Sequence, residues 1–512
     1  MQQTTESKHA GRREWIGLYV LSIACLIYSM DLSVLFLAMP AIVADLDPTA
    51  AELLWINDIY GFMVAGFLVT MGTLGDRIGR RRVLLVGAFA FGIASALAAF
   101  STTAQQLIAA RALLGIAGAT VAPSTLSLIV NLFENEGERN RAIGVWGTAF
   151  ALGGLVGPLI GGLLLQYFHW GSVFLINIPV MLGLLIAGPL LLPEYKNAEG
   201  ARIDLLSVIF SLAAVLPFIY GLKHMAAYGF EADQAVALAI GFAFGFAFIS
   251  RQKKLTHPLI DLQLFKIPAF TASLAVNLAG VFFIFGIFLF QNLFLQLVTG
   301  LSAFEAAIWS IPSSLIFTVM SFQAHRFTNR LGPSRTVILG LLVNAVGTAA
   351  MGLAAYHQSA VGILAASMVI AVGFVPVILT TTGLIVGTAP PERAGSASAI
   401  SETSAEFGGA LGVALLGSIG TFIYRSTMAG ADLSGLTPQQ VETASSTLAS
   451  AVEMVKSFGE IQPAWLDLAR SGFSLGFAAC CLLATVSLLA LAAIARRIYA
   501  TAHVDDNLPS GH

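Results

Sequence analysis

The sequence predicts an all-α protein that crosses a membrane many times, and three observations support this fold class. Of its 512 residues, 57% are hydrophobic and 11% are charged, whereas a soluble domain carries about 25% charged residues. The apolar residues gather in long runs, and a helix needs roughly 20 such residues to cross a bilayer. These runs are continuous and do not alternate with polar residues, which excludes a closed β-barrel.

Fourteen apolar runs are long enough to be transmembrane helices, and the connections between them are mostly short. Residues 1–14 are polar, and no small-residue cleavage pattern follows the first run, so we expect that run to be a retained helix. The predicted helices lie near 15–38, 53–73, 83–101, 106–131, 142–166, 171–192, 204–222, 234–250, 269–297, 303–323, 335–355, 361–387, 403–424 and 472–495.

The distribution of Lys and Arg predicts the orientation of these helices. If the N-terminus is cytoplasmic, 21 of the 26 basic residues lie in cytoplasmic segments and four lie outside, with Arg111 inside a helix. Basic residues favour cytoplasmic loops, and one helix more or fewer would reverse the sign of every later loop. The asymmetry therefore favours fourteen helices with both termini in the cytoplasm. The longest outer loop, 426–471, is rich in Ser, Thr and Ala, with a helical stretch near 437–457, and is expected to be a solvated connector.

Several classes of function are disfavoured by composition. A net charge of −2 gives no argument for a nucleic-acid partner. The three cysteines, Cys25, Cys480 and Cys481, lie in apolar segments without the spacing of a disulfide framework or a metal site. No G-x-x-x-x-G-K-[ST] loop is present, so ATP is not expected to be the energy source. The histidines are scattered near helix ends and build no nucleophile–base constellation, which disfavours an enzyme.

The loop between the second and third predicted helices carries the most specific motif. It reads Gly-Thr-Leu-Gly-Asp-Arg-Ile-Gly-Arg-Arg-Arg over residues 72–82. Its glycines allow a tight turn, and its carboxylate can accept from arginines and from free N–H groups at a helix start. This G-x-x-x-D-R-x-G-R-R-R pattern resembles the signature loop of the major facilitator superfamily. That resemblance implies a conformational role for Gly72, Asp76, Arg77, Gly79, Arg80 and Arg81.

Two further segments resemble the same superfamily. Arg111 opens Arg-Ala-Leu-Leu-Gly-Ile-Ala-Gly, which is similar to the family's buried-arginine motif. Residues 153–162 read Gly-Gly-Leu-Val-Gly-Pro-Leu-Ile-Gly-Gly, which resembles the motif of the family's antiporters. The resemblance implies an antiporter role for Gly153, Gly157, Pro158, Gly161 and Gly162. Independently of it, three of these glycines recur every four residues and form a flat helix face for close packing, and the proline should bend the helix.

Within this superfamily, the count of fourteen helices is typical of the drug:proton antiporters. The sequence most resembles the quaternary-ammonium and methyl viologen resistance exporters among them. The segments that carry this resemblance are 30–34, 54–60 and 257–262, and it covers about 12–495. One departure concerns the tenth helix, where some quaternary-ammonium exporters carry an acidic residue after the proline. Residues 311–317 read Ile-Pro-Ser-Ser-Leu-Ile-Phe and contain none, which puts efficient handling of divalent cations in doubt.

Five candidate ionisable residues lie within predicted helices or, for Glu402, directly beside the start of one, where a charge is costly and suggests function. Glu402 and Glu406 lie four residues apart and share one helix face. Two such carboxylates in a low-dielectric cavity repel each other, which favours a proton on one of them. Competition between a proton and a lipophilic cation for the pair would produce antiport. The candidates for proton coupling or substrate binding are Asp31, Asp58, Arg111, Glu402 and Glu406.

Each candidate also has a structural alternative. Asp31 could form a buried salt bridge and Arg111 could be its counter-ion. Asp58 could make an interfacial hydrogen bond near the outer end of its helix. Glu402 lies beside the predicted start of its helix, where its negative charge could stabilise the helix by interacting with the helix dipole. Glu406 is one turn deeper in the same helix.

These expectations combine into one architecture. The tails are 1–14 and 496–512, the six-helix bundles are 15–192 and 269–495, and two inserted helices lie within 193–268. The resemblance implies a substrate site between the halves near the bilayer midplane. We expect a monomeric exporter of cationic drugs in a bacterial inner membrane, without a cofactor and driven by the proton gradient. Alternatives are an exporter of another solute, such as an amino acid, a siderophore or a tetracycline–metal complex, or a lipid flippase.

Overall fold

The computed structural model is entirely helical over the residues that it describes, which are 9–48, 50–195, 204–228, 232–255, 258, 260–301, 303–390, 393–429, 445, 447–452 and 463–501. Its helices are α1 (Arg12–Leu46), α2 (Ala50–Ile78), α3 (Arg80–Ala99), α4 (Ala104–Gly118), α5 (Val121–Leu132), α6 (Glu136–Tyr167), α7 (Ser172–Leu175), α8 (Asn177–Leu191), α9 (Leu205–Tyr228), α10 (Ala232–Gln252), η1 (Leu264–Lys266), α11 (Pro268–Leu293), η2 (Phe294–Val298), α12 (Ala303–Leu331), α13 (Pro333–Tyr356), α14 (Ala360–Gly387), α15 (Ala394–Ala429) and α18 (Pro463–Thr501).

Twelve helical segments in the described part of the chain are long and apolar enough to cross a membrane. The α4–α5 and α7–α8 pairs each count once among them, as continuous segments. Helices α6 and α12 coincide with two further predicted runs and pack against each other, but they fall outside these twelve. The chain is thus a multi-pass membrane protein, and the count of fourteen stays a prediction.

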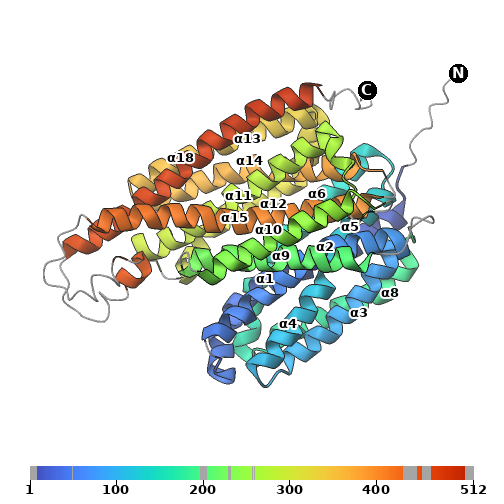
Figure 1. The fold of residues 1–512 in the computed structure, drawn as a ribbon, viewed down its shortest axis with the longest axis horizontal. Helices are drawn as coiled ribbons and strands as arrows, with labels where there is room; N and C mark the ends of the chain where they lie inside the picture. The colour runs from blue at the N-terminus through green and yellow to red at the C-terminus, as the bar shows by residue number, and fades with distance from the viewer. Residues whose placement is uncertain are drawn as a thin grey trace.

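Two hydrophobic cores organise the helices. One core draws its side chains almost entirely from Leu18 to Leu192, and the other from Ala269 to Tyr499. In Figure 1 the blue helices α1, α3 and α4 of the first half lie below the green helices α9 and α10, and the yellow to red helices α13, α14 and α18 of the second half lie above them. Large apolar side chains also face outward, such as Val86 on α3 and Phe246 on α10, which are 69% and 76% exposed. A helix that is apolar on its outer face as well as its inner one is suited to lipid.

Hydrogen bonds at the two ends of the bundle connect helices that run in opposite directions. We call the end where α2 stops and α3 starts the loop end, and the opposite one the far end. At the loop end, Ser273 near the start of α11 bonds Tyr499 near the close of α18 (2.9 Å). At the far end, Trp170 before α7 donates to Asp45 in the last turn of α1 (2.8 Å).

The two halves meet mainly through two pairs of helices, with α5 packing on α15 beside them. Helix α2 packs on α15, and α6 packs on α12. At the loop end of the second pair, Asn140 donates to Asn329 (3.3 Å), and Gly144 lies directly against the backbone of Ser321.

The inserted helices α9 and α10 form a hairpin that contacts both halves beside the α2–α15 pair. The Phe218 ring of α9 stacks on Phe407 of α15 (5.3 Å), and Tyr220 stacks on Trp55 of α2 (6.0 Å). Arg251 closes the hairpin at the loop end by a 2.6 Å contact to Asp204. Its hydrogen bonds lower the pKa of Asp204 to about 2, so the carboxylate stays charged at neutral pH.

Candidate functional site

Asp31 lies at the centre of a buried polar cluster in the first half. It is completely buried in α1, and Arg111 of α4 places Nη1 3.7 Å from its Oδ2. Asn177, at the start of α8, donates to Asp31 Oδ1 (3.1 Å) and to the hydroxyl of Ser95 (3.1 Å). The salt bridge weighed as the structural alternative is therefore present and joins α1 to α4, and Asn177 connects it to α8 and α3. A buried pair like this one is costly unless further hydrogen bonds satisfy it, as Asn177 does here.

Arg111 is held against α2 as well as against Asp31. Its Nε donates to the carbonyl of Ile56 (2.6 Å), and its guanidinium lies over the ring of Tyr60 (5.3 Å). The approach is possible because α4 carries glycine here: a Cβ on Gly115 would stand 2.5 Å from the carbonyl oxygen of Tyr60. The Arg-x-x-x-Gly spacing of the sequence thus positions the arginine and admits its neighbouring helix.

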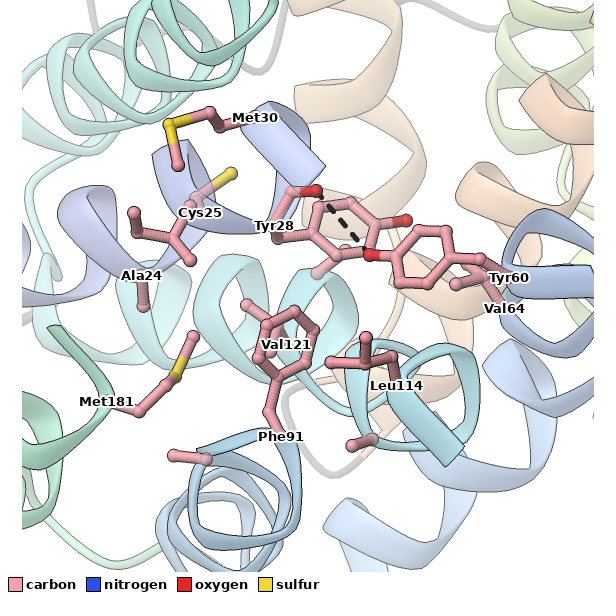
Figure 2. Packing of buried hydrophobic residues seen from close by; sticks show 14 of the residues in the cluster. Ala24, Cys25, Tyr28, Met30, Tyr60, Val64, Phe91, Leu114, Val121 and Met181 are labelled. Carbon is pink, nitrogen blue, oxygen red and sulfur yellow. Dashed lines mark hydrogen bonds between the residues drawn. The ribbon is translucent and has the colours of Figure 1, made fainter. Parts of the chain in front are cut away.

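Two tyrosines lie beside this cluster. The Tyr60 hydroxyl donates to the carbonyl of Tyr28 (3.5 Å), a contact drawn in Figure 2, and the two ring centroids are 6.4 Å apart. The tyrosine pair therefore joins α1 to α2 next to Asp31 and Arg111.

Glu402 and Glu406 lie deeper along α15 than the sequence suggested. The predicted helix began at 403, but α15 begins at Ala394, so Glu402 is more than two turns inside it and the helix-start role is wrong. Both carboxylates are partly buried. The hydroxyls of Thr403 and Ser404 beside them are buried without a hydrogen-bond partner among the described residues. This stretch of α15 thus offers acids and free hydroxyls to a ligand or to water.

Asp58 is the one candidate acid whose surroundings stay untested. It falls within α2, eight residues after the helix begins, but its side chain lies outside the described residues.

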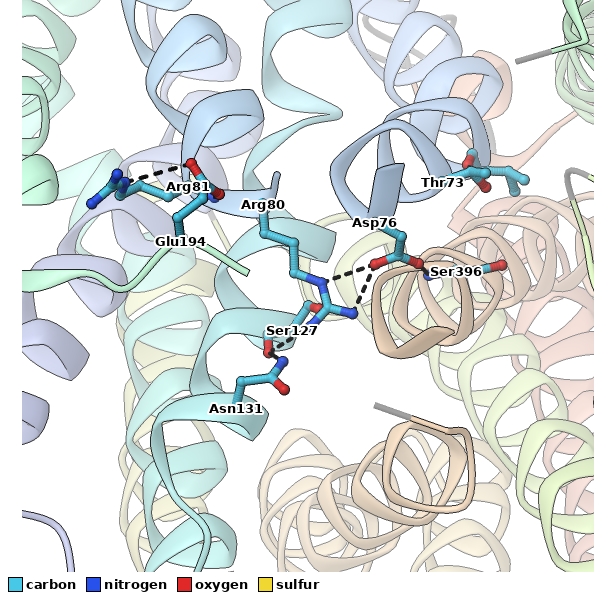
Figure 3. A network of polar contacts seen from close by, with 9 residues as sticks. Thr73, Asp76, Arg80, Arg81, Ser127, Asn131, Glu194 and Ser396 are labelled. Carbon is cyan, nitrogen blue, oxygen red and sulfur yellow. Dashed lines mark hydrogen bonds and ion pairs between the residues drawn. The ribbon is translucent and has the colours of Figure 1, made fainter. Parts of the chain in front are cut away.

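Asp76 of the signature loop connects the two halves of the protein. It accepts from Arg80 Nε (2.9 Å) and Nη2 (2.8 Å), and from the backbone N–H of Ser396 in the first turn of α15 (2.9 Å), as Figure 3 shows. The N–H groups of a first helical turn are free to bind an anion, and the helix dipole favours one there. The loop therefore holds α2 to α15 at the loop end.

The remaining loop residues bind the end of α8. Gly79 has a φ of 116°, which L side chains rarely adopt, and a Cβ there would collide with the Glu194 carboxylate. Arg81 donates to the carbonyl of Leu192 (3.0 Å) and lies 3.6 Å from Glu194. Arg77 is partly buried, and Gly72 is buried one turn before Asp76. The arginines thus form specific contacts beyond any effect on topology.

The glycine-rich motif of α6 forms the close helix contact that its spacing predicted. A Cβ on Gly153 would collide with the carbonyl oxygen of Leu26, and one on Gly161 would stand 2.6 Å from Val34, both on α1. Gly157 is buried and Gly162 is exposed. Helix α6 runs continuously through Pro158, whose side chain lies outside the described residues.

Sequence reasoning missed four residues of these networks. Asn177 and Ser95 are polar residues within apolar runs, and that signal could have marked them. Glu194 and Ser396 carried no such signal, since their roles depend on loops that meet only in the folded chain.

Replacing Asp76 by Asn is expected to impair transport while the protein still inserts. Asn can keep one hydrogen bond but loses the charge that binds Arg80 and the first turn of α15, and each charge-assisted bond is worth about 1.5–3 kcal/mol. Efflux rates at matched membrane levels measure the effect. Asp467→Asn, at an exposed acid of the far end, is the control. Normal efflux by Asp76→Asn would leave the loop with a topological role only.

Comparisons with known proteins identify the family of the chain. The family model described as Major Facilitator Superfamily matches residues 21–413. The multidrug efflux pump LfrA of Mycolicibacterium smegmatis is 36% identical over 496 residues, covering 96% of this chain and 98% of that one. The methyl viologen resistance protein SmvA of Salmonella typhimurium is 33% identical over 472 residues, covering 90% and 93%.

Solved structures share the arrangement of the helices. The human organic anion transporter MFSD10 superimposes with a TM-score of 0.62 at 15% identity, covering 93% of this chain and 99% of that one. A bacterial homologue of the lysosomal transporter Spinster gives 0.57 at 17% identity, covering 96% and 99%. At these identities the likeness concerns the fold alone.

Proposed function

The chain belongs to the Major Facilitator Superfamily and is a drug exporter, and we propose that it works as a proton-coupled antiporter of lipophilic cations. The observation that carries the proposal is the set of acids within the helix bundle. Asp31 is fully buried, and Glu402 and Glu406 are partly buried on α15. Ionisable groups in the hydrocarbon region are costly and mark ion or substrate pathways.

The proposed mechanism is competition for the α15 acids. A lipophilic cation and a proton cannot both neutralise one carboxylate, so binding of one favours release of the other. No cofactor takes part in this scheme, and the proton gradient supplies the energy.

The Asp76 contact would stabilise the conformation in which the two halves are closed at the loop end. It holds α2 against α15 at the loop end, where Asn140 and Asn329 also connect the halves. Rocking of the halves to open that end would require the bond between Asp76 and α15 to break. In an exporter oriented with the loop end toward the cytoplasm, this opening admits the drug.

The relatives favour drugs over the alternative solutes. LfrA and SmvA are named for multidrug efflux and for methyl viologen resistance, and methyl viologen is an organic cation. A lipid flippase is the rival from another class. Ethidium efflux without movement of labelled lipid in vesicles would support the exporter, and the reverse would support the flippase.

Collapsing the pH gradient is expected to stop export, whereas depleting ATP at a constant gradient is not. The reason is that protonation of the acids is the proposed source of energy. Ethidium efflux from a pump-deficient bacterium, with and without an uncoupler, measures the first part. Export that continues in uncoupled vesicles supplied with ATP would refute the proposal.

Both termini are expected in the cytoplasm of a bacterium, at its inner membrane. The basic residues predict this, and the start of α1 and the close of α18 lie at the same end of the bundle (Figure 1). A reporter active only in the periplasm should be silent when fused after Arg497. The same reporter inserted into the 426–471 loop should be active, and the opposite pattern would invert the orientation.

A further inference from the structure

A cavity lies between the halves at the loop end, apart from the acids of the proposed transport site. Its volume is about 480 Å³, within the roughly 300–1,000 Å³ of small-molecule sites. Helix α6 of the first half lines one side, and α11, α12, α13 and α14 of the second half line the other. Asp31, Arg111, Glu402 and Glu406 are not among its lining residues.

The charge of this cavity is one-sided. Arg139 is its only formally charged lining residue at neutral pH, and no carboxylate lines it in the described part of the chain. Neither an ion pair nor a side-chain hydrogen bond occupies the Arg139 guanidinium among the described residues. The helix dipoles do not decide the sign, because α11 and α13 start at the cavity while α12 and α14 end near it. An anion is therefore favoured over a cation.

Several polar groups accompany the arginine. Nδ1 of His325 is buried and makes no hydrogen bond of good geometry to the described residues. Asn140 and the hydroxyls of Thr380 and Thr388 also line the space. These groups can donate hydrogen bonds to the oxygens of a phosphate, and arginine binds phosphate through paired donors.

The rest of the lining is apolar, and it indicates an amphiphile. Ile143, Leu379 and Leu384 line the same space. The stretch of α12 that supplies His325 also carries Phe322 and Phe327, which are 50% and 39% exposed on the outside of the bundle. A ligand with an anionic head and an apolar tail would satisfy both parts of this surface. Basic pockets between transmembrane helices are suited to acidic lipid headgroups.

We propose that this cavity binds the phosphate headgroup of an acidic phospholipid, which then bridges α6 and the second half. A ligand that touches both halves stabilises the arrangement in which they are joined at the loop end. The bound lipid therefore opposes opening of that end. The proposal for this cavity does not depend on proton-coupled export, because lipid binding can be measured without transport.

The test is a titration of the purified full-length protein by native mass spectrometry. Phosphatidylglycerol, phosphatidylethanolamine of the same chain length and glycerol phosphate are the three probes. We expect phosphatidylglycerol to bind most tightly and Arg139→Gln to weaken it by roughly tenfold, the loss of one charge-assisted contact. Arg139→Lys should retain most of the affinity.

Two further variants separate the cavity from general surface charge. Arg326→Gln removes the same charge from an exposed position of α12 outside the cavity and should bind lipid normally. Gly383→Leu should abolish binding with Arg139 intact, because a Cβ at Gly383 stands 3.8 Å from Ile143, in ordinary contact, and the longer side chain fills the cavity. Phosphatidylglycerol should raise the melting temperature of the parent but not of Gly383→Leu.

Three outcomes would overturn the proposal. Equal losses of phosphatidylglycerol affinity in Arg139→Gln and Arg326→Gln would mean that the lipid is attracted by general surface charge and not by this cavity. Equal binding of phosphatidylethanolamine would mean that net negative charge is not recognised. Glycerol phosphate binding as tightly as the lipid would assign the cavity to a soluble phosphate.

Discussion

Replacing Asp31 by Asn is expected to abolish export of every cationic drug. The substitution leaves Arg111, only 2% exposed, without its carboxylate in a low-dielectric core. Breaking a buried pair by removing one partner costs about 3–5 kcal/mol. It also removes the one fully buried acid of the set on which the proposed function rests. Efflux of ethidium at matched membrane levels measures the result.

A double variant separates these two causes. Asp31→Asn with Arg111→Gln leaves neither charge buried, so thermal stability and membrane level should recover toward the parent. Export is expected to stay lost, because no carboxylate remains at position 31. Recovery of export in the double variant would show that Asp31 acts only as the structural partner of Arg111. The single variant Arg111→Gln completes a double-mutant cycle, which gives the coupling energy between Asp31 and Arg111.

Glu402→Gln and Glu406→Gln are expected to give unequal defects. At about 1.5 Å per residue, Glu402 lies roughly 12 Å and Glu406 roughly 18 Å along α15 from its start at Ala394. Glu406 therefore lies one turn deeper in the helix than Glu402. We therefore expect Glu406→Gln to lose cation affinity, by roughly 1.5–3 kcal/mol for a charge-assisted contact. Glu402→Gln should instead lose proton coupling, seen as efflux insensitive to external pH.

Membrane vesicles that hold a pH dye and a fluorescent cation report both quantities for each variant. Glu305→Gln, at an exposed acid in the first turn of α12, is the matched control and should change neither. Parental rates and pH dependence in both Gln variants, properly inserted, would refute carboxylate competition for this protein. Equal defects in the two would refute the division of labour while leaving competition in place.

The family, the helical fold and the glycine contacts could be predicted from the sequence because they depend on local pattern. Run length decides whether a helix crosses a bilayer, and spacing decides which face Gly153 and Gly161 share. The superfamily match and the exporter relatives confirm the resemblance read from the signature loop. Arg111 was expected within a helix and is buried there.

The partners of these residues could not be predicted in the same way. Asp76 and Ser396 are 320 positions apart, and only the packing of α2 on α15 brings them together. The start of α15 was misplaced because residues 394–402 are small and polar, so the apolar run seemed to begin after them. Helix formation there depends on burial against neighbouring helices, which hydropathy alone does not register.

The α9–α10 hairpin has a consequence for any motion of the halves. Helix α9 stacks on α15 through Phe218 and on α2 through Tyr220, so it belongs to both sides of a moving boundary. If α2 slides past α15, one of those aromatic stacks must slip, because a single helix cannot follow both. The two halves and the hairpin therefore move as three separate bodies. The strength of the aromatic stacks on each side of the hairpin contributes to the energy barrier between the conformations of the transporter.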